Sequence, residues 1–172
     1  AFDPHPDPYR DDAGLDLRFL NEKTAGDGGF IAARGEQFIH SKTGQPVRFW
    51  GVNRAGKATD YESAVPVAKF LAKHGVNLVR LHGGIYDDNG KLDPKKVQSI
   101  LGIVEALREQ GIYSHLSIYF PLWLQPSADN AFLKGYDGKT HPFAALYFNP
   151  DFQSQYHAWW VALMTTPSPR TK

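Results

Sequence analysis

The sequence of 172 residues contains no cysteine. Its absence excludes disulfides and thiolate chemistry and leaves the redox compartment open. No run of about 18 apolar residues is present, so we expect no membrane span. The 19 basic and 18 acidic residues give a net charge of +1 and are scattered, so no basic stripe indicates a nucleic-acid partner.

Short motifs of nucleotide and metal enzymes are missing too. The sequence has no GxGxxG, GxxxxGKS/T or GxSxG pattern, which removes the usual signatures of nucleotide enzymes and serine hydrolases. A metal site could form if His82 and His115 converged with Asp87 or Asp88, but neither HxH nor HExxH spacing supports it. We therefore expect no cofactor and no metal ion.

The first 20 residues differ from the rest of the chain. Residues 1–20 are rich in aspartate and proline, which favours an extended arm, whereas residues 21–172 are expected to form one βα domain. The opening AFDPHPDPYRDD is typical of a mature or trimmed amino terminus, compatible with a secreted or periplasmic bacterial protein. The aromatic residues gather after residue 112, where they form a core or a surface that stacks on sugar rings.

A hairpin is predicted before the first βα unit. Phe30–Ala33 and Gln37–His40 have strand-like composition and flank a turn at residues 34–36. A second turn at residues 43–46 leads into an apolar strand at Val47–Val52, which Asn53 follows. This hairpin could cover the bottom of a barrel.

Two helices are predicted from spacing and capping residues. Tyr61–Lys73 has helical periodicity, and its apolar face contains Ala64, Val67, Phe70 and Leu71. Asp93 followed by Pro94 predicts the start of a second helix, which ends at Gly111.

Two more strands and a last helix complete the pattern. Val76–Leu81 is apolar enough for a strand buried on both faces. Ile112–Tyr119 alternates, with Tyr113, His115 and Ser117 on one side. A long loop is expected over Phe120–Phe148, and Asn149 with Pro150 predicts the start of a final helix.

Strands alternating with helices indicate right-handed crossovers and a parallel sheet. The predicted fold class is α/β: the first three βα units of an eight-stranded βα (TIM) barrel, preceded by the hairpin. In such barrels the carboxyl ends of the strands carry the active site. Asn53, Arg80 and His82 stand at two of these ends.

Arg80 is the most informative polar residue. Its guanidinium keeps its charge and must find partners near a strand end. We favour a role in fixing a catalytic carboxylate, and the alternative is a structural ion pair. His82 could bind a sugar hydroxyl or orient a carboxylate, and it could also simply be hydrogen-bonded at the rim. His115 is either part of the same site or a histidine satisfied within the core.

Two acidic pairs are interpreted as structural. Asn21-Glu22 precedes every predicted strand, although an Asn-Glu pair can be catalytic where it ends a barrel strand. Asp87-Asp88 lies in YDDNG, a sequence typical of a turn, and it lacks the longer run of oxygen ligands that a calcium loop needs.

The segments LNEKTAGDGGFI, VRFWGVNRAG, LAKHGVNLVRLHG and GIYSHLSIYFPLWL resemble the amino-terminal part of a clan A glycoside hydrolase, close to family-five-like bacterial enzymes. The resemblance spans about residues 17–165. It implies a barrel with two catalytic glutamates, the acid/base in an Asn-Glu motif at the fourth strand and the nucleophile at the seventh. This sequence stops after the third helix, so neither glutamate can be assigned to one of its residues.

The resemblance also implies roles for residues that are present. Arg80 corresponds to an arginine that supports the nucleophile. The sugar cleft would be bordered by Asn53, His82, His115, Tyr119 and Trp123.

Three barrel strands alone leave two open edges that invite pairing. We expect the amino-terminal half of a retaining glycoside hydrolase acting on β-linked oligo- or polysaccharide, accompanied by the remainder of the barrel. Completion by a second copy and a rearranged fold stay open. The competing functions are a non-catalytic carbohydrate-binding protein and a self-assembled enzyme that uses Asp87, Asp88 or Glu105. Glu105 is expected to be solvated on its helix.

Overall fold

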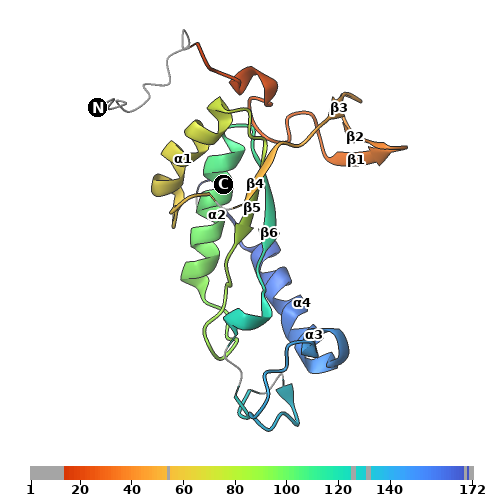
Figure 1. Cartoon of the computed structure of the whole chain (residues 1–172), viewed down its shortest axis with the longest axis vertical. Helices are drawn as coiled ribbons and strands as arrows, with labels where there is room; N and C mark the ends of the chain where they lie inside the picture. The colour runs from red at the N-terminus through yellow and green to blue at the C-terminus, as the bar shows by residue number, and fades with distance from the viewer. Residues whose placement is uncertain (1–13, 54, 125–126, 131–132, 169, 171–172) are drawn as a thin grey trace.

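The computed structural model describes residues 14–53, 55–124, 127–130, 133–168 and 170 (Figure 1). It is a mixed α/β structure with a small antiparallel sheet and a parallel sheet. Its elements in chain order are η1 (Arg18–Leu20), β1 (Ile31–Arg34), β2 (Gln37–His40), β3 (Pro46–Val47), β4 (Gly51–Asn53), α1 (Tyr61–Lys73), β5 (Leu78–His82), α2 (Pro94–Arg108), β6 (Tyr113–Ser117), η2 (Pro121–Trp123), α3 (Ala145–Phe148) and α4 (Pro150–Thr165).

The predicted hairpin is confirmed, with its first strand shifted by one residue. In β1 and β2, Arg34 pairs with Gln37, so Gly35 and Glu36 form a two-residue connection. Gly35 has a φ of 61°, in the left-handed region that such tight connections require.

The expectation of one strand over Val47–Val52 is wrong. β3 pairs with β2 in the antiparallel sheet, whereas β4 pairs with β5 in the parallel sheet. Asn77 holds the segment between them: its Nδ2 donates to the Arg48 carbonyl at 2.8 Å, and its Oδ1 accepts from the Trp50 amide at 2.7 Å. These bonds replace ladder pairing where the chain passes from one sheet to the other.

The parallel sheet has the predicted order β4-β5-β6, with each neighbouring pair parallel. Helices α1 and α2 are the crossovers, and Figure 1 shows them side by side against the parallel sheet while the antiparallel sheet extends away from it. Within the described ranges, no strand pairs with the outer edge of β4 or of β6. No helix among these residues is long and apolar enough to cross a membrane.

The prediction that the second strand is buried on both faces is wrong. In β5, Val79 and Leu81 are buried whereas Arg80 and His82 are exposed. Side chains alternate between the two faces of a strand, and α1 and α2 cover only the face that carries Val79 and Leu81. In the described part of the chain, no helix packs on the other face of this sheet, where Arg80, His82 and His115 are exposed.

Local capping rules determine where the long helices begin. Asp60, Asp93 and Asn149 each accept a backbone N–H of the first turn through the side chain. Pro94 and Pro150 occupy the first helical positions of α2 and α4, where the missing proline N–H costs nothing. The predicted starts of both helices are confirmed.

The bounds of α1 are as predicted, but its buried face is different. Phe70 is 51% exposed, and the buried side consists chiefly of Ala64, Ala68 and Ala72. These small residues let α1 approach α2 closely: a Cβ at Gly102 would lie 3.0 Å from the Tyr61 nitrogen. Close helix packing therefore selects the alanine stripe over the larger apolar residues.

Helix α2 contains a second difference from expectation. Its apolar side includes Val97 and Leu107, which are fully buried. Glu105, expected to be solvated, is buried, and its Oε1 lies 2.9 Å from Arg108 Nη2. The arginine supplies the compensating charge that a buried carboxylate needs.

The predicted loop over Phe120–Phe148 contains two short helices, η2 and α3. Near it, α4 contributes Phe152, Trp159 and Leu163 to a second core cluster. Tyr86 stacks on Trp159 with ring centroids 4.0 Å apart, and the Trp159 indole donates to the Gly90 carbonyl at 2.9 Å.

The predicted extended arm is wrong at its inner end. Arg18–Leu20 forms the 3₁₀ turn η1, and the Leu17 amide donates to the Lys73 carbonyl at 2.9 Å. Residues 1–13 of the expected arm lie outside the described ranges.

Candidate functional site

Five polar side chains share the uncovered face of the parallel sheet. In the sheet register, Arg80 aligns with Asn53 on one neighbouring strand and with His115 on the other. Two residues further along, His82 aligns with Ser117. All five therefore project to the same side. We call this set the polar face: Asn53, Arg80, His82, His115 and Ser117.

The first two strands of the polar face are joined by a hydrogen bond from His82 to Asn53. His82 Nε2 lies 2.8 Å from Asn53 Oδ1. Because an amide oxygen only accepts, Nε2 donates this hydrogen bond. The asparagine thus orients the imidazole.

The second and third strands are joined in the same way. Arg80 Nη2 donates to Ser117 Oγ at 3.1 Å. The two bonds have the same geometry. Asn53 aligns with Arg80 and bonds to His82, two residues further on, and Arg80 aligns with His115 and bonds to Ser117, two residues further on. Ser117 was not among the predicted site residues, although the alternation of its strand already placed it beside His115.

Arg80 contacts a serine hydroxyl within the described residues, and its expected role of fixing a catalytic carboxylate stays a prediction. We predicted a carboxylate beside its guanidinium, and in the described part of the chain no carboxylate forms an ion pair with it. The serine hydroxyl uses one of its donors, and the side chain is exposed. A guanidinium has five N–H donors, so most of its capacity is left for a ligand or another segment.

Trp123 closes one side of the polar face. It lies in η2, and its ring meets the His82 ring edge-on with centroids 6.1 Å apart. Phe120 contacts Trp123 in turn, at 5.8 Å. Trp123 is 37% exposed and Phe120 is 43% exposed, so the two rings form an accessible aromatic wall.

Tyr119, expected to border a sugar cleft, packs against the second core cluster. It is partly buried and packs edge-on against Phe152 at 5.4 Å and Tyr156 at 6.0 Å in the second core cluster. Burial, followed by nearby Tyr147 and Tyr156, raises the pKa of Tyr119 to about 12. Its hydroxyl therefore stays neutral at ordinary pH.

His115 is an exposed side chain, so the alternative of a core histidine is wrong. It lies on the polar face beside Arg80 in the register. Among the residues that the structure describes, no group of three or more histidine, cysteine, aspartate or glutamate side chains is placed to hold a metal ion.

The two acidic pairs have structural contacts, in line with prediction. Asn21 Nδ2 donates to the Val76 carbonyl at 2.8 Å, and Glu22 accepts the Gly28 amide at 2.6 Å. Asp87 Oδ1 accepts backbone amides of its own turn, two and four residues onward, at 3.0 and 2.9 Å. These carboxylates satisfy local backbone rather than the polar face.

The polar face offers hydrogen-bond donors, one oriented imidazole and an aromatic wall. This combination can bind a polyhydroxylated ligand, because hydroxyl groups pair with both donors and acceptors while a ring contacts apolar C–H surface. Within the described ranges it has no carboxylate to transfer protons. Comparison with known proteins finds no matching family model, curated protein or solved structure.

Proposed function

We propose that this chain is the amino-terminal part of a retaining glycoside hydrolase of the clan A, family-five-like type. In this proposal the parallel sheet is the first three strands of a βα barrel that acts on β-linked oligo- or polysaccharide. The polar face supplies the non-catalytic side of the cleft. The two glutamates that retaining hydrolysis requires would come from strands outside these 172 residues.

The observation that carries this proposal is the position of the polar face. It lies at the carboxyl ends of three in-order parallel strands, the end at which barrel enzymes bind their substrates. Arg80 donates to Ser117 through one nitrogen only, which leaves donors for a carboxylate supplied by a later strand. The open edges of β4 and β6 are the places where such strands would pair.

Sugar binding is the direct test. The full chain is titrated with β-linked gluco-, manno- and xylo-oligosaccharides by calorimetry. We expect Trp123→Ala to weaken binding by about fivefold or more, since stacking on a ring is worth about 1 kcal/mol or more.

Trp50→Ala is the matched control. Trp50 is 67% exposed and precedes β4 at the other end of the sheet, so its removal is expected to leave sugar affinity unchanged. If no oligosaccharide binds, or if both tryptophan variants weaken binding equally, the proposed cleft is wrong.

Catalysis provides the second test. We expect the 172 residues alone to release no product from aryl β-glycosides, because the polar face lacks the acid/base and nucleophile pair. Co-expression with a polypeptide supplying the remaining strands should restore turnover, and Arg80→Ala in that complex should remove most of it. Hydrolysis by the chain alone would contradict the two-glutamate mechanism.

A non-catalytic carbohydrate-binding protein is the second candidate. This candidate is favoured by the lack of a carboxylate on the polar face within the described residues. It predicts sugar binding that depends on Trp123, with no hydrolysis under any condition of complementation. A self-assembled enzyme is weaker, because Glu105 is already paired with Arg108 and Asp87 accepts its own turn amides. Sedimentation showing a well-folded monomer would remove it.

A further inference from the structure

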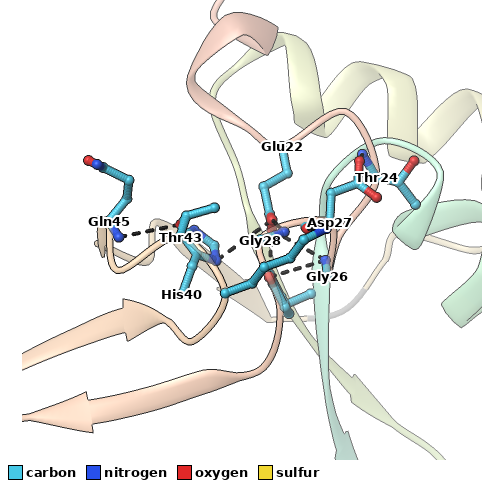
Figure 2. Close-up of polar contacts among 10 residues, drawn as sticks. Glu22, Thr24, Gly26, Asp27, Gly28, His40, Thr43 and Gln45 are labelled. Atoms are coloured by element: carbon cyan, nitrogen blue, oxygen red, sulfur yellow. Dashed lines mark hydrogen bonds and ion pairs between the residues drawn. The ribbon is translucent and has the colours of Figure 1, made fainter.

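Glu22 is the centre of the contacts between the antiparallel sheet and the amino end of the parallel sheet (Figure 2). Its carboxylate accepts the Gly28 amide at 2.6 Å, the Gly26 amide at 3.3 Å and the Tyr113 hydroxyl. Gly28 leads into β1, and Tyr113 is the first residue of β6. One side chain therefore joins the start of the hairpin to a strand far away in the sequence.

His40, the last residue of β2, lies against the same carboxylate. Its Nδ1 is 3.7 Å from Glu22 Oε1, and the two side chains are only 13% and 16% exposed. Among described residues, Nδ1 is buried and has no hydrogen-bond partner. A Cβ placed on Gly28 would come within 2.8 Å of both Glu22 and His40, so the three residues are closely packed.

The hydrogen bonds favour the ionised form of Glu22. Burial alone would raise its pKa, but the Tyr113 hydroxyl, the Gly28 and Gly26 amides and the nearby His40 outweigh burial and lower it. Burial and the Glu22 carboxylate also raise the pKa of Tyr113, which keeps its hydroxyl a donor.

Other charged groups around this cluster have other partners. Lys42 Nζ donates to the Asp27 backbone carbonyl at 3.5 Å, and the Asp27 carboxylate accepts the Thr24 amide at 3.1 Å. Arg108, on α2, pairs with Glu105. Among the described residues, His40 is the basic side chain that lies within ion-pair distance of the Glu22 carboxylate.

We propose that Glu22 and His40 form an acid-sensitive latch that seats the antiparallel sheet on the amino end of the parallel sheet and releases it when Glu22 takes up a proton. One proton on the carboxylate cancels its charge and weakens its bonds to the two amides.

The sign of the pH effect follows from the lowered pKa of Glu22. The stabilisation is present above the pKa that a glutamate has in the unfolded chain, and it is lost as pH falls through the pKa of the folded state. Release is local, because the cores of α1, α2 and β5 do not depend on this carboxylate.

Amide hydrogen exchange of the full chain, read by mass spectrometry from about pH 7.5 to about pH 3.5 and corrected for intrinsic rates, tests the latch. On acidification to about pH 3.5 we expect protection of β1–β3 to fall by up to about tenfold, the limit for one carboxylate over this range, while α2 and β5 keep theirs. Glu22→Gln should open β1–β3 already at neutral pH and remove the pH dependence. The matched control Glu36→Gln, in the exposed hairpin turn, should behave as the parent.

His40→Gln separates a latch from a simple packing contact. His40 is one of the groups that lower the pKa of Glu22, so its replacement should move the midpoint of release to higher pH. A packing role would lower protection equally at every pH. A flat profile for the parent chain, or an unchanged profile in Glu22→Gln, would overturn the proposal. If Glu22→Gln fails to fold, Tyr113→Phe removes one donor and should raise the midpoint by a smaller amount.

Discussion

The two ends of the parallel sheet use the same residue types in different ways. At the amino end, Asn21, Glu22 and Asn77 direct their side chains to backbone groups of other segments. At the carboxyl end, Asn53 and His82 bond to each other on an exposed face. Amide and carboxylate groups join the sheet to its neighbours at one end and stay accessible at the other.

This difference indicates where stability and binding are located. Side chains that satisfy backbone groups leave unpaired donors or acceptors behind when removed, which is costly. Exposed side chains paired with each other return to water when the pair is lost, at little cost. The amino end should therefore be sensitive to substitution in folding, and the carboxyl end in ligand binding.

The largest effect is expected at Gly111. Its φ is 70°, and a Cβ there would lie 2.0 Å from the Glu22 backbone oxygen. Gly111→Ala should lower the free energy of unfolding by on the order of 3–4 kcal/mol, combining backbone strain with displacement of the Glu22 segment. Urea denaturation measures it. Gly35→Ala, with φ of 61° and open space around its Cβ, should lose only about 1–2 kcal/mol, and equal losses would contradict the clash.

The next effect compares two asparagines. Asn77→Ala removes both contacts to the segment between β3 and β4, and the free energy of unfolding should fall by about 1–3 kcal/mol. Asn53→Ala removes one exposed contact, and the change should stay within about 0.5 kcal/mol. Chemical denaturation of both variants gives the comparison. A larger loss for Asn53→Ala would break the proposed contrast between the ends.

A third effect concerns Asp93, which caps the start of α2. Asp93 Oδ1 accepts the Lys95 and Lys96 amides at 2.9 and 3.3 Å. Asp93→Ala should lower the free energy of unfolding by about 1 kcal/mol, while Asp93→Asn should be nearly neutral because asparagine also caps helices well. Thermal unfolding of the pair checks this. If both variants lose the same amount, charge rather than capping dominates.

The smallest effect is expected at Ser117. Ser117→Ala should change the free energy of unfolding by less than about 0.5 kcal/mol, because its contact with Arg80 lies on the open face. The Arg80 side-chain N–H signals in NMR should exchange with water faster, since the hydroxyl no longer accepts from them. An unchanged exchange rate would show that Ser117 does not hold the guanidinium.

Much of the secondary structure was predictable from short stretches of sequence. Asp93-Pro94 and Asn149-Pro150 mark helix starts because capping and the proline position act within one turn. Alternation in β6 placed His115 and Ser117 on one side because strand geometry has a period of two. The order of strands and helices was enough to predict the parallel sheet.

The wrong expectations all depend on contacts between distant segments. Phe70 fits a helical stripe, yet the close approach of α2 buries the alanines of α1. Val47 and Val52 belong to different sheets because of Asn77, a residue beyond the first helix. No local pattern reports these neighbours.

By itself, the sequence determined the elements and the faces on which polar residues stand, since backbone geometry sets both over a few residues. Only the tertiary structure decided which face is covered, which carboxylate is buried, and that Glu22 and His40 lie together. Burial and long-range pairing depend on how segments far apart in the chain pack together. The hydrophobic effect that drives this packing acts on the apolar surface of the whole molecule and not on one segment alone.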